Sequence, residues 1–489
     1  RALAVGPSVS LESIPEEGRR TLARLIELAG SERPAWLVGG ALRELLTERG
    51  IADLDVAVSR GALELGRRLA DRLGRRFVEL DAVRGACRIV AATEPGLPLD
   101  LVDLRAPTLD GDLRARDFTV NALAVSLRDL LRNGRAPISD PTGGLDDLQA
   151  RMARLCGPAA ITDDPLRALR GVRLAMRAGW RLDVGAESAI RSAAPLVAAV
   201  AAERVREELG GILSEPNAAV GLRMLDRLGV LAVLLPESLA MRGTSQPLPH
   251  RFDVWEHSIR AVEGVDALLA DLDALAPWGP DLRAHLADEL GGGLTRREVL
   301  KLAALLHDVA KPETRTEQAG RIRFFGHDSV GARRGGAIAE RLRLPRRAGQ
   351  LLERLVAEHL RPMHLAQAGE ITRRARFRFF RDLGDDARDL LLLALADAAA
   401  LTGESPLTVW ASEGGLVVRT LMAGVEPEAA AAATRPLLRG EDVMQAFGLP
   451  AGPEVGRLLE RAREAQALGL VATREEALAL LRRGDGPGA

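Results

Sequence analysis

Two aspartates, Asp53 and Asp55, stand two residues apart in an apolar stretch. Side chains alternate between the faces of a β-strand, so this spacing places both carboxylates on one face. Two clustered acids repel each other unless a cation lies between them. Mg²⁺ is the expected cation, because it prefers oxygen ligands and keeps coordination positions for phosphate oxygens. The pair indicates metal-assisted chemistry on a phosphate ester, although an isolated Asp-x-Asp is more often a solvated strand end.

A pair of glycines, Gly39 and Gly40, follows the apolar run 35–38 and precedes a helical pattern over 41–47. Glycines at such a junction let backbone N–H groups approach an anion at a helix N-terminus. Arg43, one turn further, is a candidate ligand for the same phosphates. A lone Gly-Gly is usually a tight turn, so the glycine pair indicates phosphate binding only together with the aspartate pair. A metal pair and a phosphate cradle on successive elements are the layout of a nucleotidyl transferase.

A second cluster of polar residues begins at 116–123, where we expect a helix to start, and continues through 140–148 to a helix expected over 164–178. In that last helix three arginines recur every three residues and share one stripe with Asp164, namely Arg167, Arg170 and Arg173. An Asp–Arg pair presents an acceptor beside donors, which complements the edges of cytosine and adenine, while arginines hold phosphates. The alternative is a capped helix with ordinary intrahelical ion pairs.

The chain of 489 residues is long enough for several domains, and its 47 % hydrophobic and 28 % charged residues are typical of a protein with buried cores. The net charge of −1 requires any nucleic-acid contact to use a local basic face. With no tyrosine, we expect no aromatic platform for stacking bases. Two cysteines form no disulfide framework, no apolar run reaches about 18 residues, and the first residues lack a signal-peptide pattern. We expect a cytoplasmic protein without membrane contact.

Strand patterns are confined to the first part of the chain, at 35–38, 54–58, 76–80, 87–92 and 99–104. Helical patterns follow at 145–155, 164–178, 186–202, 203–213 and 218–228. We therefore predict an α+β chain with a small five-stranded head over 1–145 and a helical neck and body over 146–236. A histidine-containing domain over 237–405 and a helical tail over 406–489 complete it. Arginine-rich faces at 202–206 and 457–463 are candidates for RNA phosphate contacts.

These motifs resemble, in order and spacing, those of class II tRNA nucleotidyltransferases, the CCA-adding enzymes and their bacterial poly(A) polymerase relatives. The resemblance rests on 37–44, 53–55, 116–122, 140–144 and 164–173, and it covers about 1–236. It implies that Asp53 and Asp55 carry the Mg²⁺ that activates the tRNA 3′-hydroxyl. The other roles it implies are triphosphate binding by the glycine pair and Arg43, shaping of the nucleotide pocket by Arg116 and Asn121, selection of CTP or ATP by Asp164 and Arg167, and phosphate contacts by Arg170 and Arg173. Glu44 replaces the usual aspartate and keeps its charge.

A second departure concerns the segment before the Arg116 motif. CCA-adding members have a flexible stretch there that helps to switch the pocket from CTP to ATP. Only residues 106–113 lie between Arg105 and Arg114, which resembles the deletion in CC-adding enzymes. The resemblance thus implies addition of two cytidines, with a separate A-adding enzyme acting on the product. The alternatives are a complete CCA-adding enzyme using CTP and ATP, and a poly(A) polymerase.

All seven histidines lie between 250 and 405, and His307 and Asp308 are adjacent after an apolar helical run. Imidazole and carboxylate together suit Mn²⁺, Fe²⁺, Ni²⁺ or Zn²⁺. The pattern resembles the HD phosphohydrolase superfamily. That resemblance implies a metal site made of His257, His307, Asp308 and Asp397, with His327 and His359 as candidates for a second metal. A further hypothesis makes this domain the enzyme and the head a degenerate RNA-binding module.

Overall fold

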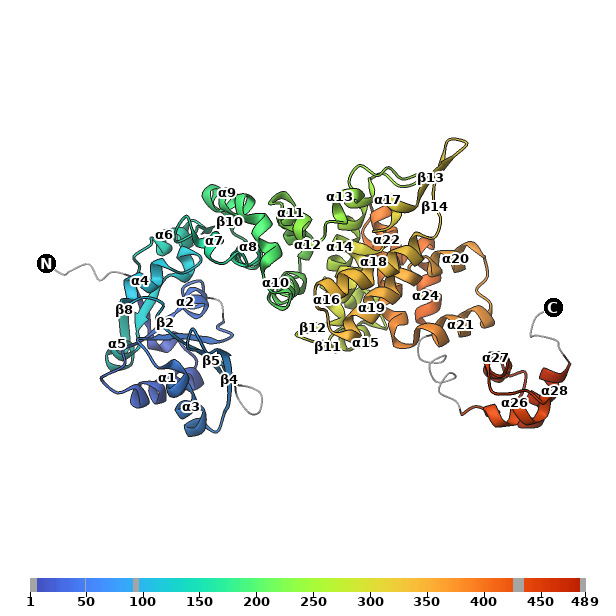
Figure 1. Cartoon of the computed structure of the whole chain (residues 1–489), viewed down its shortest axis with the longest axis horizontal. Helices are drawn as coiled ribbons and strands as arrows, with labels where there is room; N and C mark the ends of the chain where they lie inside the picture. Colours follow the sequence, from blue (N-terminus) through green and yellow to red (C-terminus); the bar gives the residue numbers. More distant parts are fainter. Residues whose placement is uncertain (1–6, 49, 91–95, 425–434, 484–489) are drawn as a thin grey trace. The chain divides into compact units, whose positions relative to one another are not determined.

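The computed structural model describes residues 7–48, 50–90, 96–424 and 435–483, which form two compact units (Figure 1). The first unit comprises Arg1–Val200 and Met224–Leu234, and the second comprises Ala201–Arg223 and Leu235–Ala489. The segment expected as a helical neck, 146–236, is therefore shared between the two. Residues 91 and 92 of an expected strand lie outside the described residues.

The first unit contains an eight-stranded sheet in the order β1-β8-β7-β2-β3-β6-β5-β4. The five expected strands form as β2 (Ala35–Val38), β3 (Leu54–Val58), β4 (Arg76–Asp81), β5 (Ala86–Val90) and β6 (Leu99–Asp103). Three strands were not expected, namely β1 (Ser8–Ser10), β7 (Ala124–Ser126) and β8 (Arg135–Ser139). The first two have three residues each, and β8 contains a proline, so none has a strong strand pattern. The expectation of α+β architecture is confirmed, with a larger sheet.

Helices α1 (Glu16–Ala29) and α3 (Ala62–Leu73) pack against each other, and α3 also packs against β4, β5 and β6. The apolar positions of both helices recur at helical spacing. They enter one buried cluster with the sheet, in which Leu25 and Leu69 join Val56 and Leu101. This core fixes the strands that carry the aspartates.

Two expected helices are corrected by the structure. Residues 119–121 form a 3₁₀ turn that leads directly into β7, because Ala124 and Val125 are buried beside β2. The helix expected over 145–155 ends at Gln149 as α6 (Gly144–Gln149), and Arg151 has a φ of 54°. Met152–Ala153 then forms β9, which pairs with β10 (Arg181–Leu182). In both places burial and pairing with a distant segment outweigh local helix propensity.

The remaining neck patterns form helices close to their expected ranges. They are α8 (Arg167–Ala178), α9 (Val184–Ala193), α10 (Ala202–Ser214) and α11 (Ala218–Arg227). The pattern at 186–202 is divided, because α9 gives way to a 3₁₀ segment, Ala194–Ala199, with a proline in its first turn.

The second unit is built around helices that pack closely on one another: α14 (Val254–Ala270), α16 (Arg296–Leu306), α18 (His327–Arg341), α19 (Arg346–Glu358) and α22 (Ala387–Thr402). The last helices, α26 (Gly440–Phe447), α27 (Pro453–Ala467) and α28 (Arg474–Arg482), share a small core of their own. Ion pairs join Arg374 and Arg378 of α21 (Arg373–Leu383) to Glu464 of α27. None of the described helices is both long and apolar enough to span a membrane.

Candidate active site and metal centres

Three carboxylates meet where β3 and β6 run parallel. Asp55 of β3 lies opposite Asp100 of β6, and Asp53 directly precedes β3. Each of the three offers an oxygen within 4.8 Å of the others. Asp100 was not expected from the sequence, because its place depends on the β3–β6 register. Asp103, three residues after Asp100 on the same strand, accepts the Ala62 N–H at 2.8 Å and fixes the start of α3.

The surroundings of the carboxylate cluster disfavour its ionised form and raise the pKa values of two of its members. Burial, together with the neighbouring Asp53, raises the pKa of Asp55 to about 6. Burial and Asp100 raise the pKa of Asp53. Arg88 of β5 contacts both oxygens of Asp100 at 2.6 Å and lies 3.7 Å from Asp53. Three carboxylates beside one guanidinium leave excess negative charge, and an all-oxygen set of this kind fits a hard divalent cation.

The glycine pair wraps around Asp55. Gly39 has a φ of 66°, and a Cβ on it would lie 3.0 Å from Asp55 Oδ2, while a Cβ on Gly40 would lie 3.2 Å from the same atom. The Ala41 N–H at the start of α2 (Gly39–Leu46) donates to Asp55 Oδ2 at 3.0 Å. The first turn of this helix therefore positions a metal-ligand candidate. The glycine spacing predicts that the N–H groups of this turn face phosphate, whereas the Ala41 N–H faces Asp55.

A cavity of about 390 Å³ opens beside the carboxylates. It brings together nine residues that the sequence and the sheet register single out: Gly39, Gly40, Asp55, Asp100, Arg116, Asn121, Asp164, Arg167 and Arg170. Arg43 lines a different cavity, and Arg173 lines neither of these two. The placement joins Asp55, Asp100, the glycine turn and the expected base-reading pair in one space large enough for a nucleotide, whereas Asp53 is not among the lining residues.

Several side chains of this cavity are fixed by hydrogen bonds. Arg116 donates to Asp112 Oδ2 from both Nε and Nη2, at 3.0 and 2.9 Å. Asn121 accepts from Arg43 and donates to Asp117. Arg167, 8 % exposed, donates to the backbone carbonyls of residues 115, 116 and 160 at 3.2–3.4 Å. A guanidinium held by carbonyls is pre-oriented, which suits it to discriminate between ligands.

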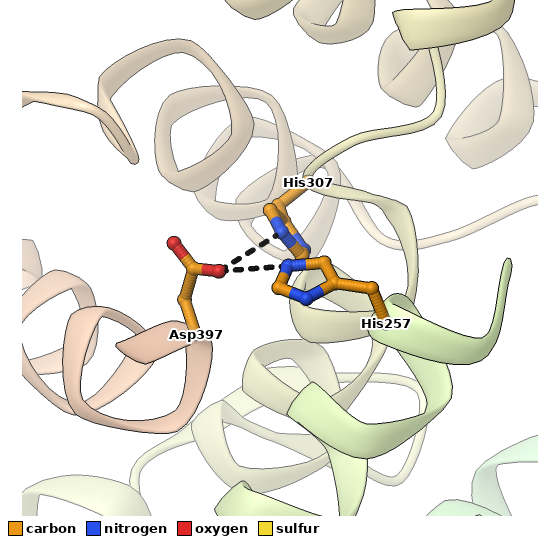
Figure 2. Close-up of side chains that lie close together, drawn as sticks. All are labelled: His257, His307 and Asp397. Carbon is orange, nitrogen blue, oxygen red and sulfur yellow. Dashed lines mark hydrogen bonds and ion pairs between the residues drawn. The ribbon is translucent and has the colours of Figure 1, made fainter. Parts of the chain in front are cut away.

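The second unit contains a histidine–aspartate centre that is buried except at Asp397, whose side chain is 32 % exposed (Figure 2). His257 of α14 and His307, which follows α16, both direct Nε2 toward Asp397 Oδ1 of α22, at 2.9 and 3.5 Å. Asp308 Oδ2 lies 3.2 Å from His307 Nε2. Its Oδ1 faces the Nε2 atoms of His327 and His359 at 3.4 and 3.6 Å. All six residues expected at this centre thus come together, with Asp308 between two groups of ligands.

The imidazole tautomers of this centre favour a cation. The Nδ1 atoms of His307, His327 and His359 each face a backbone carbonyl at 2.7–2.9 Å, so they carry the proton and leave Nε2 as an acceptor. The Nε2 atoms of His327 and His359 lie 3.3 Å apart, so in this tautomer their two lone pairs face each other. Among the described residues, His307 Nε2 and Asp308 Oδ1 are buried without a hydrogen-bond partner. These orphaned atoms fit a divalent metal bound by imidazole and carboxylate.

The charges around Asp308 are strongly coupled. Although burial opposes both shifts, Asp308 and Asp397 raise the pKa of His307 to about 10, and His307 with Lys311 holds the pKa of Asp308 well below its usual range. A proton and a metal ion therefore compete for His307 Nε2, and metal binding would release that proton. Lys311 Nζ lies 2.6 Å from Asp308 Oδ2. His250, which the sequence analysis left aside, stacks edge-on against His257 with ring centres 5.3 Å apart.

Comparison with known proteins adds independent evidence. Family models described as "Poly A polymerase head domain", "Probable RNA and SrmB- binding site of polymerase A" and "HD domain" match residues 35–154, 181–241 and 254–400. The chain is 37 % identical over 92 % of its length to the A-adding tRNA nucleotidyltransferase of Deinococcus radiodurans, covering 95 % of that protein. The chain belongs to the tRNA nucleotidyltransferase and poly(A) polymerase family. It is therefore an enzyme that adds nucleotides to tRNA 3′ ends.

Other similarities agree with this membership. The CC-adding tRNA nucleotidyltransferase of Thermus thermophilus is 36 % identical over 92 % of this chain and 93 % of its own length. The solved structure of a CCA-adding enzyme in apo form superposes with a TM-score of 0.65 at 18 % identity, covering 97 % of both chains. At that identity the structural match establishes the fold alone.

Proposed function

We propose that this tRNA nucleotidyltransferase is a CC-adding enzyme, which transfers two CMP residues from CTP to the tRNA 3′ end without a nucleic-acid template. The observation that supports this is the short segment between β6 and the Arg116 motif. Six of its residues form α4 (Leu109–Arg114). Thr108 caps that helix by accepting the Gly111 N–H. A segment so short leaves little chain for a second, ATP-binding arrangement of the pocket.

Buried contacts also hold this segment in place. Asp112, 1 % exposed, accepts the Arg105 N–H at 3.0 Å through one oxygen and pairs with Arg116 through the other. The segment is thereby attached to Arg105 and Arg116, both of which line the cavity. A rigid wall favours one base size over switching between two.

The residues that line the cavity, with Asp53 beside them in the carboxylate cluster, divide into three proposed roles. Asp53, Asp55 and Asp100 would hold Mg²⁺, which lowers the pKa of the attacking 3′-hydroxyl and neutralises charge on the phosphates. Asp164 and Arg167 would read the cytosine edge, while Arg170 would contact phosphate. Arg116 and Asn121 would shape the ribose side. The expected phosphate roles of Arg43 and Arg173 stay predictions, since neither lines this cavity.

A specific similarity favours a second candidate. The Deinococcus relative bears the name A-adding, at an identity nearly equal to that of the CC-adding relative. Addition of the terminal adenosine to a CC end is therefore the main competing activity. Complete CCA addition and poly(A) synthesis are the remaining alternatives.

An incorporation assay separates these candidates. Purified protein with Mg²⁺ is given tRNA ending at the discriminator base or in CC, with CTP or ATP alone. We expect two cytidines on the first substrate and no adenosine on either. Adenosine on the CC end alone would identify an A-adding enzyme. Addition of both, stopping at CCA, would refute the argument from the short segment, and ATP-only extension without a tRNA requirement would indicate a poly(A) polymerase.

We further propose that the histidine–aspartate centre is a metal-dependent phosphohydrolase site. A bound Mn²⁺, Fe²⁺, Ni²⁺ or Zn²⁺ would supply a nucleophilic hydroxide at neutral pH. The orphaned acceptors at His307 and Asp308 support metal binding there. Hydrolysis of a 2′,3′-cyclic nucleotide by protein loaded with each metal in turn tests the activity, and elemental analysis of purified protein identifies the resident ion.

We propose the domain boundaries 1–145, 146–236, 237–405 and 406–489, with tRNA contacts on the neck and tail. Removal of 406–489 tests the tail contact. Weaker tRNA binding with unchanged CTP binding is the expected result.

A further inference from the structure

The first unit contains a second cavity of about 320 Å³, which the catalytic roles above do not use. Its walls include Arg43 and Glu44 of α2, Arg177 of α8, Trp180 and Arg151. The last two come together because β9 pairs with β10, and the Arg181 N–H donates to the Arg151 carbonyl at 3.1 Å. The cavity is thus assembled by the turn that sequence analysis had expected to be helical.

The charge of this cavity suits an anion. Three guanidinium groups line it, against the single carboxylate of Glu44. Glu44 Oε1 lies 3.4 Å from Arg177 and 3.5 Å from Arg43. The remaining positive charge matches a phosphate, for which guanidinium groups are the usual protein ligands.

The second carboxylate oxygen of Glu44, Oε2, has no hydrogen-bond partner among the described residues. The residue is only 6 % exposed, and this oxygen is buried. An unsatisfied buried carboxylate oxygen is costly, and the neighbouring guanidinium groups of Arg43 and Arg177 offset part of that cost.

Trp180 and the backbone of Arg151 complete the cavity. Trp180 is half-buried, so part of its indole is accessible for stacking. Arg151 has a φ of 54°, a left-handed conformation that is uncommon for a residue with a side chain. Such strain is maintained where the surrounding structure requires it and is enriched at binding sites.

We propose that this cavity is a second nucleotide-binding site. Arg151 and Arg177 bind the phosphate, Trp180 stacks on the base, and Glu44 orients Arg43 and Arg177 at the cavity wall. The volume lies at the lower end of the range for ligand sites, which fits one nucleotide. That nucleotide comes either from free CTP or from the RNA strand, and the two sources share this chemistry.

The proposal of a second site does not depend on whether the enzyme adds cytidine or adenosine. Arg43 nevertheless links the two cavities. Arg43 lines the second cavity and donates to Asn121, which lines the first. Binding is measured without turnover, and the readout is the change in bound CTP between each variant and the unsubstituted chain. A wrong assignment of the added nucleotide would change the count in every protein alike and does not affect this difference.

The experiment counts CTP bound per full-length chain by equilibrium dialysis without RNA, and measures tRNA affinity separately. The variants are Arg151→Ala and Trp180→Leu, with Arg151→Lys to restore the charge. Arg135→Ala is the matched control, because Arg135 is also exposed in the first unit and lines neither cavity. Circular dichroism and thermal unfolding establish that each variant is folded.

Loss of one bound CTP per chain in Arg151→Ala and Trp180→Leu but not in Arg135→Ala would establish a free-nucleotide site. An equal number of bound CTP in all proteins, with tRNA bound at least about tenfold more weakly by both variants, would assign the site to the RNA strand. The tenfold change corresponds to about 1.4 kcal/mol. In either case Arg151→Lys should recover most of the binding. Unchanged CTP stoichiometry together with unchanged tRNA affinity in the folded variants would overturn the proposal.

Discussion

Asp55 is surrounded by groups that act in opposite directions on its charge. The Ala41 N–H donates to its carboxylate, whereas burial and Asp53 raise its pKa to about 6. A carboxyl whose pKa is raised on folding destabilises the folded state above that pKa, and this cost disappears below the unfolded value. At the residue scale, the side chain is therefore retained at the expense of stability, as expected of a metal ligand.

The substitution Asp55→Asn should raise the stability of the protein and lower its activity. An asparagine keeps an acceptor for the Ala41 N–H and removes the buried charge. At pH 8 without divalent metal, we expect the free energy of unfolding to rise by an amount on the order of 1 kcal/mol. Nucleotide incorporation should fall by about a hundredfold or more, because metal stabilisation of transition-state charge is worth several kcal/mol. Thermal unfolding and single-turnover incorporation measure the two effects.

The metal response provides the control for this variant. Mg²⁺ should raise the unfolding midpoint of the unsubstituted protein, and this gain should shrink as the pH falls through about 6, because protons then compete for Asp55. The variant should show little of it. An equal Mg²⁺ response in both proteins would remove Asp55 from the metal site.

At the scale of elements, the junction of β2 and α2 is set by one left-handed glycine. Gly39→Ala should reduce incorporation strongly, because the new Cβ would lie 3.0 Å from Asp55 Oδ2 and displace the carboxylate. The backbone conformation adds about 1 kcal/mol of strain. Gly134→Ala is the matched control, since Gly134 has a φ of 70° in the same unit and nothing lies within 4 Å of its added Cβ. Comparable losses of activity in the two variants would indicate strain alone.

The short segment containing α4 is the second element whose attachment has consequences. Asp112→Ala removes the acceptor for the Arg105 N–H and for Arg116. We expect the free energy of unfolding to fall by about 1–3 kcal/mol. The KM for CTP should rise, because Arg116 loses its orientation.

Asp112→Asn separates the two contacts, because it keeps an acceptor for the Arg105 N–H but not the pairing with Arg116. A normal KM for CTP in Asp112→Asn would mean that Arg116 needs no fixed partner.

At the scale of the whole molecule, the two centres lie in different compact units. Asp53→Ala should therefore abolish nucleotide incorporation and leave cyclic-phosphate hydrolysis unchanged. Asp308→Asn, which keeps the side-chain size, should abolish metal binding in the second unit and leave incorporation intact. Activity assays and elemental analysis of both variants check this. Loss of hydrolysis in Asp53→Ala would indicate one shared active site.

Residue spacing and residue types predict which side chains of the head share a face and that the histidines group together. Asp53 and Asp55 share a face because strand periodicity is local, and the Gly39–Gly40 junction follows from the ends of adjacent elements. The three arginines of α8 recur at helical spacing for the same reason. The six residues of the histidine–aspartate centre were recognised from residue types and a family pattern. The strand and helix spacings need only short stretches of chain, whereas the centre spans residues 257–397 and was grouped by the family resemblance.

Tertiary structure alone decided the positions that depend on pairing between distant segments. Asp100 joins the carboxylate cluster through the β3–β6 register, which no local pattern encodes. The strands β1, β7 and β8 are too short, or too interrupted, to have a periodic pattern of their own. Arg151 and Trp180 form a cavity only because two-residue strands pair across about thirty residues of chain. Local spacing fixes which side chains face the same way, whereas packing in three dimensions determines which of them meet.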